Sequence, residues 1–178
     1  ALIAQLVAEL MQGIPESRWD LVMRQIGVIA PYRRQNNLIQ QELRAIDARL
    51  REIRVDTVDR FQGGEREIVI VSLVNSNAAR SIGSLHADWR RMNVAVSRAR
   101  RKLVIVGDRE TFTREESRPE EADARARYRR LFTELDQLIA EGEAMVVGSL
   151  TLDSIQRVEG DVPDWAAMPK VRGAEPPR

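Results

Sequence analysis

Residues 55–74 read VDTVDRFQGGEREIVIVSLV, and this stretch decides the fold. It joins the end of one β-branched run to a longer one, EIVIVSLV at residues 67–74, through a polar corner with two adjacent glycines. Such runs, bounded by turn residues, predict buried strands. Further runs are QIGVIA at residues 25–30, EIRVDTV at residues 52–58 and KLVIVGD at residues 102–108. The sequence therefore predicts four strands.

Apolar residues at helical spacing separate these strands. They are Leu2, Leu6, Val7 and Leu10 before the first strand, Leu38, Ile39, Leu43, Ile46 and Leu50 after it, Trp89, Met92, Val96 and Ala99 before the last, and Tyr128, Leu131, Phe132, Leu135, Leu138 and Ile139 after it. Gly13 with Pro15 should end the first helix, and the last should end near Gly142. Apolar strands alternating with helices predict an α/β fold whose parallel sheet has helices on both faces and all four runs as central strands.

Length and composition favour one domain followed by a tail. The chain has 178 residues, of which 43% are hydrophobic and 31% charged, as in an ordinary globular protein. We expect a domain over residues 1–150, closing with a possible short strand at residues 144–150, and a tail or linker over residues 151–178. Without a long apolar run or a cysteine, we expect no membrane partner, no disulfide and a cytoplasmic location.

Three unusual stretches follow predicted strands, where ligands bind in open parallel sheets. They are PYRRQ at residues 31–35, TVDRFQGGE at residues 57–65 and GDRE at residues 107–110. Each one alone also fits a structural role, for example Tyr32 as an interface aromatic or Arg33 as a solvated helix start. Their combination makes this edge of the sheet the candidate site.

The predicted helix within residues 86–100 places Arg91 and Arg98, seven residues apart, together on the side opposite its apolar stripe. Because the chain has one histidine and no cysteine, no metal site is predicted. A lone histidine such as His86 is most often a surface or capping residue. The charged run at residues 113–130 is most simply a solvated loop and helix start.

Three stretches in this order, residues 26–35, 55–74 and 90–108, resemble the C-terminal motor region of superfamily 1B helicases, the group of the nonsense-mediated-decay helicase and senataxin. The resemblance covers roughly residues 1–150. It implies a RecA-like fold of the P-loop NTPase class that forms one half of an ATP cleft. Single-stranded nucleic acid would run across this domain and an N-terminal RecA-like motor domain of the same polypeptide.

The same resemblance implies roles for single residues. Arg98 would be the catalytic arginine that reaches the γ-phosphate, and Glu65 would bind the nucleotide ribose. The full set of implied contacts is Gln62, Gly63, Glu65 and Arg91 for the nucleotide, and Tyr32, Arg33 and Thr57 for nucleic acid. An arginine supplied across an interface can accelerate phosphoryl transfer by roughly 10³–10⁵.

The chain has no GxxxxGK[ST] phosphate loop and no acidic pair after a strand to hold magnesium. ATP and Mg²⁺ would therefore be held mainly by the N-terminal motor domain, and this chain alone should not hydrolyse ATP. The leading hypothesis is the second motor domain of an ATP-dependent helicase. The alternatives are a non-catalytic nucleic-acid-binding or regulatory module with the same fold, and an unrelated parallel α/β domain with surface arginines. DNA and RNA both remain open as the strand.

Overall fold

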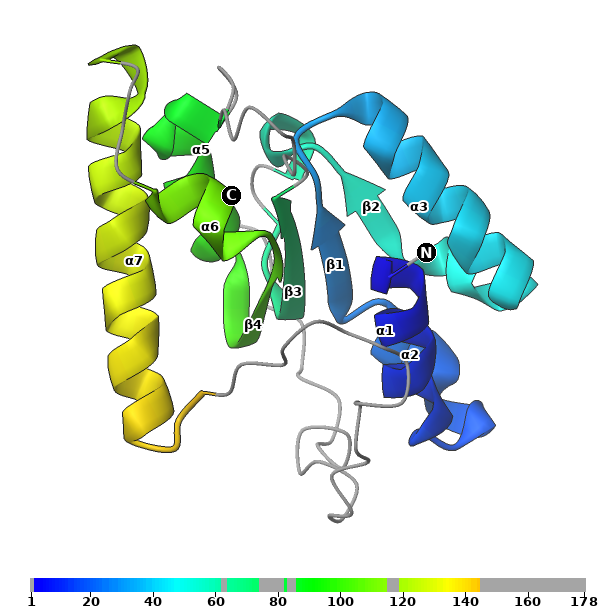
Figure 1. Cartoon of the computed structure of the whole chain (residues 1–178). Helices are drawn as coiled ribbons and strands as arrows, with labels where there is room; N and C mark the ends of the chain where they lie inside the picture. The colour runs from blue at the N-terminus through cyan, green and yellow to red at the C-terminus, as the bar shows by residue number, and fades with distance from the viewer. Residues whose placement is uncertain (1, 62–63, 74–81, 83–85, 115–118, 145–178) are drawn as a thin grey trace, which may run out of the picture.

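The computed structural model describes residues 2–61, 64–73, 82, 86–114 and 119–144. Its strands form one sheet in the order β2-β1-β3-β4, and every neighbouring pair is parallel (Figure 1). The strands are β1 (Ile26–Ile29), β2 (Arg54–Asp56), β3 (Arg66–Leu73) and β4 (Ala99–Gly107). The predicted α/β fold with a parallel sheet is confirmed, and its arrangement is RecA-like.

Helices precede, separate and follow the strands. The α-helices are α1 (Leu2–Gln12), α2 (Trp19–Met23), α3 (Arg33–Ile46), α5 (Trp89–Val96), α6 (Arg109–Thr113) and α7 (Ala122–Ala140). The short 3₁₀ helices are η1 (Glu16–Arg18), η2 (Ala48–Glu52), η3 (Val58–Phe61) and η4 (Pro119–Glu121). Within the described residues, no helix combines the length and the apolar character that crossing a membrane requires.

The helices form a layer on each face of the sheet, with α1, α2 and α3 on one side and α5, α6 and α7 on the other (Figure 1). Alternation along β3 supplies both cores, since Ile68 and Ile70 join the first and Val69 and Val71 the second. The predicted cover on both faces is therefore confirmed.

Two details of the strand predictions were wrong. Within the described part of the sheet, only β1 and β3 are central, and β2 and β4 are the outermost strands. Strand β4 also begins at Ala99, which pairs with Arg66, three residues before the predicted run. Pairing with β3 thus extends the strand to Ala99, Arg100 and Arg101. A prediction from apolar residues alone left these three residues out of the strand.

The helix stripes were predicted in outline. In α1 the buried residues are Ile3, Ala4, Val7 and Met11. The buried face of the helix is therefore rotated relative to the predicted apolar face. In α3, Ile39 and Leu43 are buried, but Leu38 and Ile46 are each 47% exposed. Helix α3 ends at Ile46 because Asp47 takes an extended conformation and its side chain accepts a hydrogen bond from Arg49 N. Leu50 therefore lies in η2 rather than in α3.

The last predicted helix is confirmed as α7, and Gly142 follows its end with φ of 80°. The solvated reading of residues 113–130 was wrong in part, because Glu121 and Arg125 are buried. The possible strand at residues 144–150 and the tail at residues 151–178 lie, apart from Ala144, outside the described residues. The boundary at residue 150 stays a prediction.

Candidate functional site

Residues 57–65, of which the structure describes 57–61 and 64–65, connect the carboxyl end of β2 to the amino end of β3. This segment leaves the end of β2 and must reach the start of the parallel strand β3, so it crosses back over β1. Its anchor is Phe61, whose side chain is fully buried. A Cβ added to Gly27 of β1 would lie 2.5 Å from Phe61 Cζ. The segment therefore links a carboxyl edge, where strands end, to an amino edge, where they begin.

Three predicted nucleic-acid contacts lie at the carboxyl edge. Tyr32 and Arg33 begin α3 directly after β1, and Arg33 is exposed. Thr57 follows the neighbouring strand β2, and Ala30 N donates to Asp56 O at 3.2 Å, which ties the two strand ends together. The Thr57 hydroxyl makes no hydrogen bond to any described residue. It is therefore available to a ligand.

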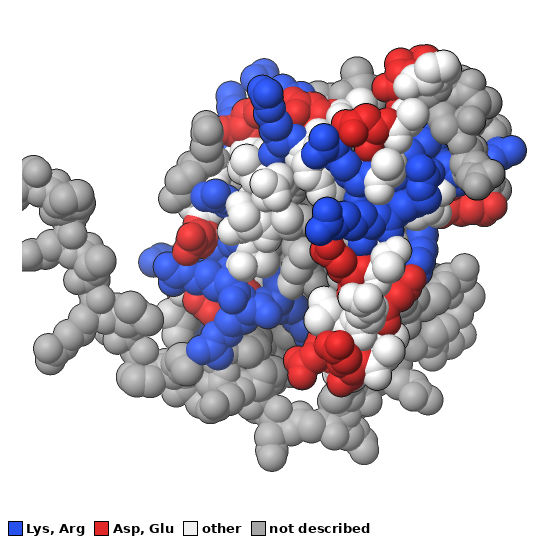
Figure 2. Space-filling view, turned by 90° about the vertical axis from the view of Figure 1, so that its left-hand side faces the viewer, with Lys and Arg blue, Asp and Glu red and all other residues white. Residues whose placement is uncertain are grey.

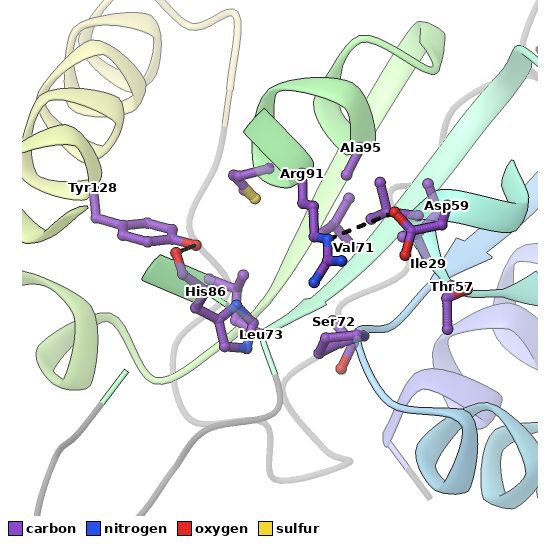
Figure 3. Close-up of a pocket in the computed structure, with 13 residues that line it drawn as sticks. Ile29, Thr57, Asp59, Val71, Ser72, Leu73, His86, Arg91, Ala95 and Tyr128 are labelled. Carbon is purple, nitrogen blue, oxygen red and sulfur yellow. Dashed lines mark hydrogen bonds and ion pairs between the residues drawn. The ribbon is translucent and has the colours of Figure 1, made fainter. Parts of the chain in front are cut away.

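Arg91 also lies at the carboxyl edge, which corrects its predicted place beside Arg98. Its Nε lies 3.6 Å from Asp59 Oδ1 (Figure 3). The same nitrogen lies 3.8 Å from Asp88 Oδ2. Both partners are solvent-exposed, so these loose pairs stabilise the fold little. The contact with Asp59 instead joins the start of α5 to the segment that follows Thr57. Arg91 thus belongs with the predicted nucleic-acid residues by position.

A cavity of about 50 Å³ opens between these elements. Figure 3 shows Arg91, Asp59, Thr57, Ser72 and His86 around it. Its floor is apolar and comprises Ile29, Val71, Leu73, Met92 and Ala95. By volume it holds a water molecule or a small group rather than a nucleobase.

His86 is buried, which corrects the expectation of a surface or capping residue. It is 6% exposed, and its ring packs edge-on against Phe112 with centroids 5.1 Å apart. Burial lowers the pKa of His86 from 6.5 to about 4, so the imidazole is neutral near pH 7. Its Nε2 has no hydrogen-bond partner among the described residues.

Glu65 and Arg98 lie together at the amino edge. Glu65 directly precedes β3, and Arg98 directly precedes β4. Arg100 Nε donates to Glu65 Oε2 at 2.7 Å. This hydrogen bond, followed by the charges of Arg100 and Arg98, holds the pKa of Glu65 below its usual value. The exposed carboxylate is therefore ionised and surrounded by guanidinium groups.

Arg98 does not lie on α5, contrary to the prediction. The helix ends at Val96, and Ser97 caps it with Oγ donating to Val94 O at 3.0 Å. Arg66 N then donates to Arg98 O at 2.9 Å, which fixes Arg98 to the start of β3. Arg91 and Arg98 consequently lie at opposite ends of the helix, about 10 Å apart along its axis at a rise of roughly 1.5 Å per residue.

The guanidinium of Arg98 has weak partners only. Its Nε donates to Val94 O at 3.3 Å and its Nη2 to Ser97 Oγ at 3.4 Å. No described carboxylate lies within ion-pair distance of it. By contrast, Arg100 is paired with Glu65. Unlike Arg100, Arg98 is thus free to meet an anion at this edge. Gln62 and Gly63, the other predicted nucleotide contacts, lie outside the described residues.

Side chains of η4 and α7 make buried polar contacts with Ile82 and His86, a feature that sequence reasoning missed. Glu121 and Arg125 form a buried ion pair at 2.7 Å, and Glu121 Oε2 also accepts from Ile82 N at 3.4 Å. Farther along, the Tyr128 hydroxyl donates to His86 O at 3.3 Å. The signal was the short spacing of Glu121 and Arg125 within a run that contains many other charges.

The GDRE stretch after β4 has a structural role. Asp108 caps α6 by accepting from Glu110 N at 3.1 Å and from Thr111 Oγ1 at 2.6 Å. Arg109 makes a two-pronged ion pair with Asp136 of α7, with distances of 2.8 and 2.6 Å. These bonds cap α6 and attach it to α7. The polar groups of Asp108 and Arg109, which lie in a predicted ligand-binding stretch, are therefore engaged in structural contacts.

The outer face of α7 carries both signs of charge. Figure 2 views the molecule from the side of α7, and blue and red side chains lie next to each other on it. Ion pairs four residues apart join Arg127 to Asp123 at 3.0 Å and Arg130 to Glu134 at 3.1 Å. A nucleic-acid track needs a surplus of positive charge, so this face is a solvated one rather than a binding surface.

The comparisons with known proteins support a motor domain of superfamily 1 helicases, a class that the parallel RecA-like sheet fits. The chain belongs to the AAA domain family, whose profile matches residues 1–110.

Curated relatives agree with this class. The chain is 47% identical over 83 residues to the human DNA replication ATP-dependent helicase/nuclease DNA2, covering 46% of this chain and 8% of the relative. The mouse protein of that name is 35% identical over 136 residues, covering 76% of this chain and 11% of the relative. In Xenopus tropicalis the identity is 43% over 89 residues, or 50% of this chain and 8% of the relative.

The chain thus spans only about a tenth of these relatives. They support the superfamily, whereas the narrower placement beside the nonsense-mediated-decay helicase and senataxin is not confirmed.

Proposed function

We propose that this chain is the second motor domain of an ATP-dependent DNA helicase that translocates on single strands. The observation that carries the proposal is the division of the predicted ligand residues between two edges. Tyr32, Arg33 and Thr57 lie where β1 and β2 end, whereas Glu65 and Arg98 lie where β3 and β4 begin. One edge thus suits the strand and the other suits the nucleotide.

Two connections run between these edges and would couple the ligands. The first is the segment of residues 57–65, and the second is α5 with Arg98 behind it. They are tied to each other at both ends, by the pair of Asp59 with Arg91 and by the hydrogen bond from Arg66 N to Arg98 O. If binding to a strand phosphate moved Thr57, these contacts would therefore transmit the movement to Arg98.

At the nucleotide edge, Arg98 would approach the γ-phosphate and offset the charge that develops in the transition state. Glu65 would accept hydrogen bonds from the ribose hydroxyls, after Arg100 has moved aside or turned. ATP would supply the phosphoryl group that is transferred to water. Within the described residues, no three histidine, cysteine or acidic side chains gather into a group that could hold a metal ion. A phosphate loop and metal ligands would come from an N-terminal motor domain.

The names of the relatives favour DNA as the strand, because they are DNA replication helicases. At the carboxyl edge, contacts from Arg33 and Thr57 would go to backbone phosphates. Such contacts fix position without reading sequence. Binding should therefore weaken with salt and vary little with base sequence.

Strand-stimulated ATP turnover by the full-length protein that contains this chain tests the proposal. Arg98→Ala should lower the turnover rate by about 10³-fold or more while nucleotide affinity changes little. Arg98→Lys should restore little, since an ammonium lacks the guanidinium fork. Arg130→Ala, on the outer face of α7, is the matched control. If Arg98→Ala left stimulated turnover unchanged, the non-catalytic module would be the better description.

A further inference from the structure

Two arginines at the amino edge converge on one glycine. Arg54 opens β2 and Arg66 opens β3, and their guanidinium carbons lie 4.5 and 5.9 Å from the centre of the Phe61 ring. A Cβ added to Gly64 would lie 3.2 Å from Arg54 Nη1 and 3.7 Å from Arg66 Nη1. Two cationic donors therefore lie within contact distance of the position that a Gly64 side chain would occupy.

Neither arginine has an anionic partner in the described part of the chain. Arg54 Nη2 donates to the backbone oxygen of Arg60, and Arg66 Nη1 donates to that of Glu65 at 2.8 Å. Arg66 Nε is buried without a hydrogen-bond partner. Backbone carbonyls carry partial charges only, so both positive charges remain largely uncompensated. The nearby arginines Arg100 and Arg101 are instead paired with carboxylates.

Holding two like charges together costs stability. Burial, and then the charge of Arg54, lower the pKa of Arg66. An anion between the two guanidinium groups would reverse this effect, because each would gain a charge-assisted hydrogen bond. Phosphate suits such a site, since its oxygens accept from two arginines at once.

We propose that Arg54 and Arg66 bind one phosphate group in front of Gly64, beside the edge that carries Glu65 and Arg98. The inference rests on the proposed function, because that function supplies two phosphate sources, the bound nucleotide and the strand. The site lies at the amino edge, so the nucleotide is the source that fits its position.

Thermal unfolding of the full-length protein with pyrophosphate, at constant ionic strength, tests the site directly. Pyrophosphate should raise the Tm of the wild-type protein, and this rise should shrink in Arg54→Gln and Arg66→Gln. Arg101→Gln, which removes a paired arginine of the same edge, is the control and should keep the full rise. Gly64→Ala keeps both charges but places a methyl group against both guanidinium groups, so it should also reduce the rise. An equal rise in all variants would overturn the proposal.

Two further measurements separate the sources of phosphate. If the group belongs to the nucleotide, Arg54→Gln and Arg66→Gln should each weaken ATP binding by about tenfold or more, as for a lost hydrogen bond to a charged group. If it belongs to the strand, the slope of log affinity against log salt should fall by about 0.7 per contact while ATP affinity is kept. No change in either quantity would overturn the proposal. These assays do not depend on Arg98. They would therefore still test the phosphate site if Arg98 proved not to be the arginine finger.

Discussion

The Phe61 ring lies so close over Gly27 of β1 that a single added carbon at Gly27 would lie 2.5 Å from Cζ and 3.0 Å from Cε1 of that ring. The glycine lets the segment of residues 57–65 cross a central strand at contact distance. Both proposed ligand edges depend on this crossing, because the segment begins at Thr57 and ends at Glu65.

Gly27→Ala should therefore destabilise the domain by about 1–3 kcal/mol, since a fully buried ring has to move. Urea unfolding of the purified protein measures this change. Gly13→Ala is the control, because nothing lies within 4 Å of a Cβ at that exposed position. Equal stability of the two variants would show that the ring has room to adjust.

The buried pair of Glu121 and Arg125 should be sensitive to the loss of one partner. Arg125→Met leaves the Glu121 carboxylate buried without its cation and should cost about 3–5 kcal/mol. Replacing both residues, with Glu121→Gln beside Arg125→Met, should cost less. Arg130→Met removes an exposed pair of the same helix and should change stability by about 0.5 kcal/mol or less. A single variant as stable as the double would contradict this account.

His86 predicts a pH dependence. The unfolded chain binds a proton at His86 below pH 6.5, whereas the folded chain does so only near pH 4. A lowered histidine pKa means that the stabilisation is complete above pH 6.5 and is lost as pH falls towards 4. The loss should amount to about 1–3 kcal/mol at 1.36 kcal/mol per pKa unit. Unfolding measured between pH 4.5 and pH 7 checks it.

His86→Gln is the control for this dependence and should flatten the curve within that window. The carboxylates of Asp47 and Asp136 have pKa values below 3.8, lowered chiefly by hydrogen bonds from Arg49 and Arg109. Their stabilisation is lost only at lower pH. An unchanged slope in His86→Gln would assign the effect to other groups.

The contact of Asp59 with Arg91 should matter for coupling more than for stability. Asp59→Asn weakens the link between the Thr57 segment and α5, so the stimulation of ATP turnover by single strands should fall about fivefold, a typical coupling energy. Unstimulated turnover should not change. Asp123→Asn on the outer face of α7 is the control. Full stimulation in Asp59→Asn would mean that the two edges communicate by another route.

Strand binding should depend on Arg33. Arg33→Ala should lower the affinity of the full-length protein for single-stranded DNA and reduce the salt slope by about 0.7. Arg44, at the other end of α3, is exposed as well, and Arg44→Ala should change neither quantity. Equal effects of the two variants would indicate that only the net charge counts.

The sequence predicted the strands and their parallel order well, because continuous β-branched runs leave few alternatives. It did not predict that Arg91 and Arg98 lie apart, since this depends on where α5 ends. Helical spacing continues through Arg98 in the sequence, but Ser97 caps the helix and pairing with Arg66 draws Arg98 and Ala99 towards β3. Local periodicity carries no information on such a long-range hydrogen bond.

Single-residue environments were the least predictable part. Charged residues such as Arg125 are usually exposed, and burial here depends on a partner one helical turn away. Likewise, Arg54 and Arg66 are twelve residues apart and meet only because the chain between them folds back over β1. Neither relationship has a signature in composition or spacing.

The position of α7 bears on how this domain is produced for experiments. The family profile ends at residue 110, and a recombinant product cut there would lack Phe112 and Tyr128. These two fully buried rings cover His86 and Trp89, with centroids 5.1 and 5.4 Å apart. Their removal would leave the start of α5 in water, next to bare apolar surface. Such a shortened product should therefore aggregate on expression, whereas one that retains α7 should be recovered in the soluble fraction.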